Sequence, residues 1–159
     1  MDTIASYEEL VRFFSESGLL HQAEPAEALI KIPTRKDALD GVMFIRWQAD
    51  HQVVHFVQTM GFEVPAERLQ PLAMAMALLN HVLPLPGFGV NVGARQCYFR
   101  ITMPLRPEGT ITRKEIQGLF NVCVRTAAEQ HQALRDVAVG NADPMQILQA
   151  SAAFSGAAG

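Results

Sequence analysis

The sequence predicts an α+β fold in which an antiparallel sheet has its helices packed on one face. Two segments, Gly41–Thr59 and Phe88–Arg106, alternate apolar and polar residues on both sides of a turn, as β-hairpins do. Between them lies a seventeen-residue apolar stretch, Ala66–Val82, with helical spacing. One more strand and two flanking helices complete the predicted order: helix, three strands, helix, two strands, helix.

The first helix is predicted to begin after Ser6. Ser6 can cap the helix, and the side chain of Glu9, at the third helical position, can bond back to the backbone of the cap. Gly18 is the predicted end of the helix. Ala28–Pro33 then reads as the first strand. Because proline cannot donate a hydrogen bond to a neighbouring strand, Pro33 favours a sheet edge or a strand end.

Strand pairing assigns the two faces of the first hairpin. With Asp50-His51 as a two-residue loop, directly opposed residues share a face. One face is then nearly all apolar, with the opposed pairs Trp47 and Val54, Ile45 and Phe56, and Met43 and Gln58.

The second hairpin is interpreted in the same way, with Ala94-Arg95 as its loop. Its predicted core pairs are Val92 and Cys97, Val90 and Phe99, and Phe88 and Ile101. The opposite face of both hairpins is half-polar and free to bind something. The candidate partner-binding residues on this sheet face are Phe44, Arg46, His55, Tyr98 and Arg100.

The last helix is predicted to start after Thr112, which can form a capping box with Glu115, and to end near Gly140. A short helix is expected at Asp143-Pro144, because aspartate caps well and proline suits the first helical position. We therefore expect one α+β domain over residues 1–140, and a short C-terminal helix with a flexible tail, Ser151–Gly159, over residues 141–159.

The middle helix lacks a polar face and must be covered on both sides. Met74, Leu78 and Val82 lie outside its usual core stripe. Two covers are possible: a second copy of the chain, or the terminal helices of the same chain. The first predicts a homodimer with Met74, Leu78 and Val82 near the interface.

Composition excludes several classes of protein. At 159 residues with a formal net charge of −3, the chain suits one soluble domain and gives no reason to expect a nucleic-acid partner. Cys97 and Cys123 lack zinc-type spacing and sit in apolar contexts, which indicates buried thiols in a reducing compartment. No membrane-spanning stretch or signal segment is evident, so we expect a cytoplasmic protein without membrane contact.

No motif for catalysis, a metal or a cofactor is found. His51 and His55 stand four apart, but on a turn and a strand rather than on a helix where this spacing binds metal. Gly87-Phe88-Gly89 precedes a strand, whereas a phosphate-binding glycine loop follows one. We therefore expect a protein that is not an enzyme, with no cofactor and no metal site.

Three segments carry a resemblance to a known family. They are Ala77-Leu78-Leu79-Asn80-His81, Gly87-Phe88-Gly89-Val90-Asn91 and Tyr98-Phe99-Arg100-Ile101-Thr102-Met103-Pro104-Leu105. Together with the order of elements, they resemble the YbjN family, which shares the type III secretion chaperone-like fold. The resemblance implies a homodimeric, non-enzymatic protein that binds other proteins or acts in regulation.

Two functions follow as hypotheses. The first is a dimeric protein-binding module, a chaperone-like or regulatory adaptor, which binds a partner protein through the apolar helix and the sheet face. The alternative is a small-molecule or anion-binding protein in which Arg46, Arg100, His55 and Tyr98 converge on a ligand. An ordinary solvated sheet face is the third possibility for these residues.

Overall fold

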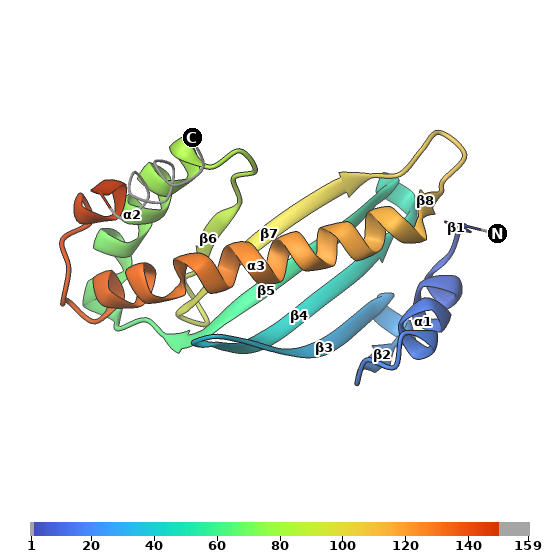
Figure 1. Cartoon of the computed structure of the whole chain (residues 1–159), viewed down its shortest axis with the longest axis horizontal. Helices are drawn as coiled ribbons and strands as arrows, with labels where there is room; N and C mark the ends of the chain where they lie inside the picture. The colour runs from blue at the N-terminus through green and yellow to red at the C-terminus, as the bar shows by residue number, and fades with distance from the viewer. Residues whose placement is uncertain (1, 150–159) are drawn as a thin grey trace.

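The computed structural model describes residues 2–149, and its centre is a six-stranded antiparallel sheet with strand order β2-β3-β4-β5-β7-β6 (Figure 1). The predicted order of helices and strands is confirmed, and the predicted tail Ser151–Gly159 lies outside the described residues. The main elements are α1 (Tyr7–Glu16), β3 (Leu29–Lys36), β4 (Leu39–Gln48), β5 (Val53–Glu63), α2 (Leu69–Val82), β6 (Phe88–Asn91), β7 (Gln96–Pro104) and α3 (Arg113–Ala138).

Three short strands escaped prediction. β1 (Thr3–Ile4) pairs with β8 (Ile111–Thr112), and β2 (Gln22–Glu24) pairs with the start of β3. The chain also forms three single-turn 3₁₀ helices, η1 (Pro25–Glu27), η2 (Ala49–His51) and η3 (Ala66–Arg68). Segments of two or three residues are too short to show a periodic pattern.

The long helix α3 crosses the sheet and covers one face of it (Figure 1). The α3 residues Ile116, Cys123, Ala127 and Leu134 are buried against the sheet. The helices α1 and α2 lie on the same side. Phe14 of α1 packs on Phe120 of α3 with ring centroids 6.1 Å apart, and Met76 of α2 contacts the buried Cys97 of β7 with the sulfur atoms 3.6 Å apart. Among residues 2–149, no helix lies over the opposite face of the sheet.

The two predicted capping motifs, at Ser6 and Thr112, are confirmed at the atomic level. Ser6 Oγ accepts a hydrogen bond from the backbone N–H of Glu9, and the Glu9 carboxylate accepts one from the N–H of Ala5. Thr112 and Glu115 form the reciprocal capping box before α3. These bonds satisfy donors that a helix N-terminus otherwise leaves unpaired. Within residues 2–149, no helix is both long and apolar enough to span a membrane.

The register of the first hairpin is as predicted, although its loop is longer. Trp47 opposes Val54, Ile45 opposes Phe56 and Met43 opposes Gln58, all on the α3 side. Pairing stops at Gln48 and Val53, because η2 and the left-handed Gln52 (φ +51°) close the turn. The face assignment survives because adding one residue to each side of a loop leaves the opposed pairs unchanged.

The predicted register of the second hairpin is wrong by two residues. Val90, not Val92, opposes Cys97, and Phe88 opposes Phe99 rather than Ile101. The Asn91 side chain accepts a hydrogen bond from the N–H of Ala94 at 3.0 Å, which closes a four-residue loop. Val92 therefore leaves the core and is 64% exposed.

The pairing of β5 with β7 is irregular around Gly61. The β5–β7 register shifts between Thr59 and Glu63, and Gly61 has φ +76°. A Cβ atom added to Gly61 would lie 1.9 Å from the carbonyl oxygen of Asp40. Glycine is thus required here both by the backbone conformation and by the neighbouring strand.

Side chains and prolines protect the sheet edges. Asn80, in the last turn of α2, donates from Nδ2 to the carbonyl oxygen of Phe88 at 2.9 Å and accepts from the N–H of Phe88 at 2.9 Å and of Gly87 at 3.2 Å. It thereby pairs with edge strand β6 as a backbone amide would. At the other edge, Pro33 lies within β3, where no hydrogen bond to β4 needs its missing N–H.

His131 is a buried histidine on the sheet-facing side of α3. It is 5% exposed, its ring packs edge-on against Phe62 with centroids 5.4 Å apart, and its Nδ1 has no hydrogen-bond partner among the described residues. Burial lowers the pKa of His131, although the backbone of Met60 opposes part of that shift. The imidazole is therefore neutral in the folded protein at neutral pH.

We expect the free energy of unfolding to fall as the pH is lowered from about 7 to about 5. The pKa of His131 in the folded protein is below its ordinary value. The contribution of the neutral ring to the free energy of unfolding is therefore complete above the ordinary pKa, and it is lost as the pH falls toward the pKa of the folded state. Urea unfolding of the His131→Leu variant at several pH values should show a shallower pH dependence than the parent. An unchanged dependence would contradict the assignment.

Candidate binding face of the sheet

The uncovered face of the sheet is concave and forms a cavity of about 640 Å³. All five residues predicted for this face line it: Phe44, Arg46, His55, Tyr98 and Arg100. The register brings them together, since Arg46 opposes His55 while Phe44 and Arg100 both oppose Val57 on the strand between them. Their roles in binding remain a prediction.

His55 is fixed between two neighbouring side chains. Its Nε2 contacts Gln48 Oε1, and its Nδ1 lies 2.7 Å from Thr102 Oγ1. An amide oxygen only accepts, so in the neutral ring Nε2 carries the proton and Nδ1 accepts from the threonine hydroxyl. Burial lowers the pKa of His55, and the positive charges of Arg100 and Arg46 lower it further. A neutral imidazole thus sits in a positive field.

Two of the three cationic side chains on this face form ion pairs with carboxylates. Lys31 Nζ lies 2.6 Å from Glu24 Oε1, and Arg46 Nη2 lies 3.1 Å from Glu27 Oε2. Arg100 is exposed and makes no ion pair within residues 2–149. Both carboxylates come from the short β2–η1 segment, which the sequence did not reveal as part of the site. Only the tertiary pairing of β2 with β3 brings them to the cavity.

Two aromatic side chains give the face its apolar portion. The ring of Phe44 has Lys31 Nζ 5.9 Å from its centroid, a cation–π distance. The ring of Tyr98 covers Gly89 on the adjacent strand β6, where an added Cβ would lie 2.6 Å from the tyrosine Cζ. Gly89 therefore leaves the space that this ring occupies.

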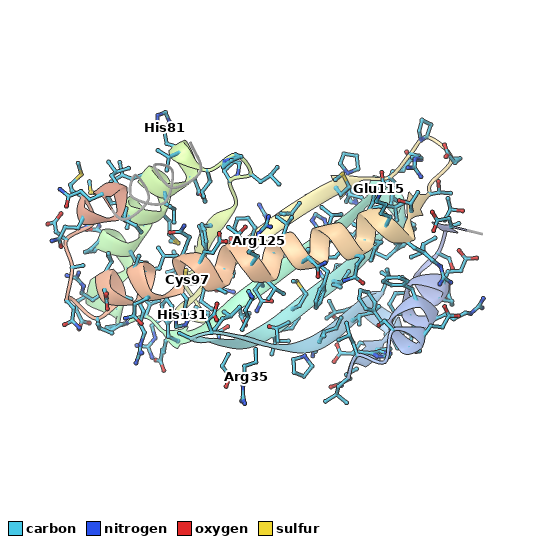
Figure 2. All side chains as sticks on the ribbon, in the orientation of Figure 1. Arg35, His81, Cys97, Glu115, Arg125 and His131 are labelled. Carbon is cyan, nitrogen blue, oxygen red and sulfur yellow. The ribbon has the colours of Figure 1, made fainter. Side chains whose placement is uncertain are left out.

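A second candidate surface is the outer side of α2. Met74 is 56% exposed and Val82 is 45% exposed, while Leu78, between them in the same i, i+4 row, is partly buried against the core. The terminal helices of the chain do not cover this row within the described residues. Leu85, which follows α2, and Val92, beside β6, add exposed apolar surface at 51% and 64%. His81 points away from the molecule at this end (Figure 2).

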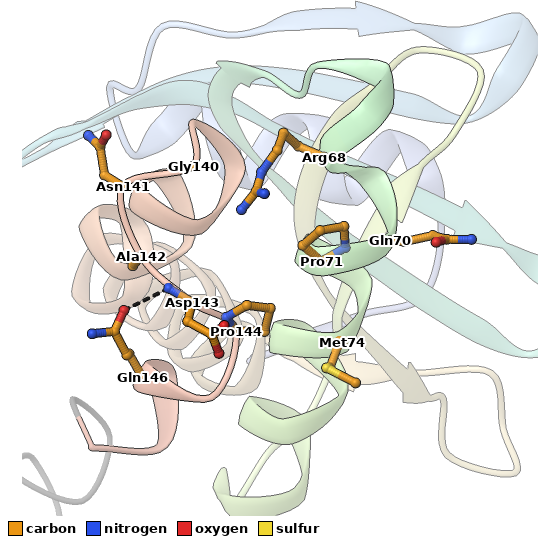
Figure 3. A pocket seen from close by; sticks show the side chains of 10 residues that line it. All are labelled: Arg68, Gln70, Pro71, Met74, Gly140, Asn141, Ala142, Asp143, Pro144 and Gln146. Atoms are coloured by element: carbon orange, nitrogen blue, oxygen red, sulfur yellow. Dashed lines mark hydrogen bonds between the residues drawn. The ribbon is translucent and has the colours of Figure 1, made fainter.

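A second hollow, of about 610 Å³, lies between the start of α2 and the chain that follows α3 (Figure 3). Arg68 donates from Nε and Nη2 to the carbonyl oxygen of Val137, at 3.1 and 2.7 Å. The Asp143 carboxylate accepts from the N–H of Met145, and the Asp143 N–H donates to Gln146 Oε1. These polar groups are occupied in ending α3 and starting the next helical turn.

Neither cysteine is placed for catalysis. Cys97 and Cys123 are both buried, and burial raises the pKa of each thiol to about 12. Cys97 instead contacts the Met76 sulfur at 3.6 Å. In the part of the chain that the structure describes, no three His, Cys, Asp or Glu side chains gather as metal ligands.

Three comparisons with known proteins bear on this arrangement. A family model described as "YbjN: Putative bacterial sensory transduction regulator" matches residues 6–135. A solved structure described as "YbjN, a putative transcription regulator from E. coli" shares the fold with a TM-score of 0.54 and 13% sequence identity, over 94% of this chain and 93% of that chain. No curated protein matches the sequence.

Proposed function

The chain belongs to the YbjN family, and from this premise we propose that it is a regulatory protein without enzymatic activity that acts as a homodimer and binds a partner protein. The family is described as a putative regulator of sensory transduction, which supports a regulatory role. The observation that carries the proposal is the presence of two separate surfaces suited to contact: the exposed apolar row of α2 and the concave sheet face.

The α2 row is the proposed dimer interface. Met74, Leu78 and Val82 form a ridge with i, i+4 spacing, and the exposed small residues Ala73 and Ala77 form a groove beside it. Ridges of this spacing pack into matching grooves of a second helix. The same surface on a second copy supplies both a ridge and a groove, and this outer row, residues 73–82, carries no Asp, Glu, Lys or Arg that would repel its copy.

We expect light scattering at micromolar concentration to give about twice the 17.5 kDa mass of one chain. The substitutions Met74→Glu and Val82→Glu should yield folded monomers, because both side chains are exposed in the single chain. Leu20→Glu is the control, since Leu20 is 78% exposed but lies between α1 and β2. A parent protein with the mass of one chain would refute the dimer.

The concave sheet face is the proposed surface for the partner protein. If a partner chain binds there, Phe44→Ala and Tyr98→Ala should each weaken its capture from native cytoplasm by about 1 kcal/mol, roughly fivefold. Thermal melts would verify that both variants stay folded, and Leu20→Ala would serve as a control for loss of exposed apolar surface. Equal recovery of the partner by all three variants would remove this face from the proposal.

A further inference from the structure

The concave sheet face carries positive charge although the chain as a whole is negative. Lys31, Arg46 and Arg100 line the cavity against two carboxylates, Glu24 and Glu27, whereas the formal net charge of the chain is −3. The neutral state of His55 follows from burial and from this local field. A negatively charged ligand is therefore attracted to this face more than to the rest of the surface.

The carboxylates of the β2–η1 segment already hold two of the three cations. Glu24 pairs with Lys31, and both side chains are about one third exposed, at 30% and 34%. Glu27 pairs with Arg46 in a more open position, with side chains 60% and 44% exposed. Such an exposed pair contributes little to stability and exchanges readily with a competing carboxylate. Arg100 has no ion-pair partner within residues 2–149.

Apolar side chains separate the cations. Val57 lies between Phe44 and Arg100 on the three adjacent strands, and Leu29 opposes Arg46. A small inorganic anion would leave this apolar surface unused. A peptide segment that carries carboxylates and apolar side chains would use both, and a cavity of about 640 Å³ is large enough for several of its residues.

We propose that the concave face binds an acidic, partly apolar peptide segment of the partner protein, with Arg100 as the anchoring cation and Arg46 as a second cation released from Glu27. This inference rests on the proposed function, because it specifies the chemistry of the partner at the same surface. Glu27 then acts as an internal competitor, which occupies Arg46 until a carboxylate of the partner replaces it.

The test uses a fluorescein-labelled peptide of alternating glutamate and leucine, with fluorescence anisotropy on the full chain. Arg100→Gln should weaken binding about tenfold, the value of one charge-assisted hydrogen bond. Glu27→Gln should strengthen binding about threefold, because it frees Arg46. Arg35→Gln is the matched control: it removes the same charge from an arginine that lies outside the cavity at the edge of the sheet (Figure 2).

The inference is wrong if the parent protein does not bind the peptide, or if it binds a peptide with glutamine or lysine in place of glutamate equally tightly. It is also wrong if Arg100→Gln and Arg35→Gln change the affinity for the peptide equally. Displacement of the peptide by inorganic phosphate or by an oligothymidylate at lower concentrations than by unlabelled peptide would also overturn it. If peptide binding fails while Phe44→Ala still weakens partner capture, only the acidic chemistry is wrong. If that aromatic effect is absent as well, the sheet-face part of the proposed function fails.

Discussion

Replacing Asn80 by leucine is expected to lower the free energy of unfolding by about 3 kcal/mol. Asn80 supplies three hydrogen bonds to the backbone of Gly87 and Phe88, all in a partly buried position. Leucine is close in size but cannot donate or accept. The carbonyl of Phe88 and the N–H groups of both residues would then lie against an apolar side chain without partners, and each unsatisfied group is costly.

Urea unfolding followed by circular dichroism measures this loss. His81→Leu is the matched control, because it adds the same side chain at the next position of α2, which is exposed. It should change the free energy of unfolding by less than about 0.5 kcal/mol. Asn80→Asp keeps the acceptor but removes the donor to the Phe88 carbonyl, so it should fall between the parent and the leucine variant. Equal stability of Asn80→Leu and His81→Leu would show that these bonds contribute nothing.

Replacing Gly61 by alanine is expected to cost at least about 3 kcal/mol. The backbone at Gly61 has φ +76°, which disfavours any residue with a Cβ atom by about 1–2 kcal/mol. In addition, the new Cβ would lie 1.9 Å from the Asp40 carbonyl oxygen, which is backbone and cannot rotate away. The strand β4 must therefore move, and with it the pairing that orders the sheet.

Gly109→Ala separates the two contributions to this loss. Gly109 has nearly the same backbone angle, φ +75°, but an added Cβ would meet no atom within 4 Å. Its variant should lose only the conformational part, about 1 kcal/mol. Thermal or urea unfolding of both variants gives the difference, which is the cost of the clash. If the two variants unfold alike, the close approach of Gly61 to β4 is not a constraint on the fold.

The sequence was sufficient for those parts of the fold that depend on periodicity. Trp47 and Val54 could be paired because both flanking strands alternate over many residues, so the face of each side chain was determined even with the wrong loop length. The Val92 pairing was wrong because only four residues of β6 are paired. In so short a strand, the Asn91 side chain decides where the turn begins, and no alternation pattern reports it.

The candidate site also contains residues that strand alternation predicts and residues that it does not. Arg46, His55 and Arg100 were predicted together because they share a strand face, and strand alternation is visible in the sequence. Glu24 and Glu27 were missed, since a three-residue strand and a single 3₁₀ turn have no period. The ion pairs that they make with Lys31 and Arg46 depend on the fold of the whole N-terminal half. Asn80 was noted as a motif residue, but its bonds to β6 depend on the path of residues 83–87.

Pro33 has a consequence for the behaviour of the protein at high concentration. The hydrogen bond from the Trp47 N–H to the Ala28 carbonyl fixes which backbone groups of β3 point toward β4. The N–H and C=O groups of even-numbered residues bond to β4, and those of odd-numbered residues point away from it, toward the edge of the sheet. β2 covers the outward groups only as far as Lys31. Beyond it, the next outward position is Pro33, which has no N–H to offer, followed by the charged Arg35. A strand from another molecule finds no continuous ladder there, so this edge resists the intermolecular pairing that begins aggregation.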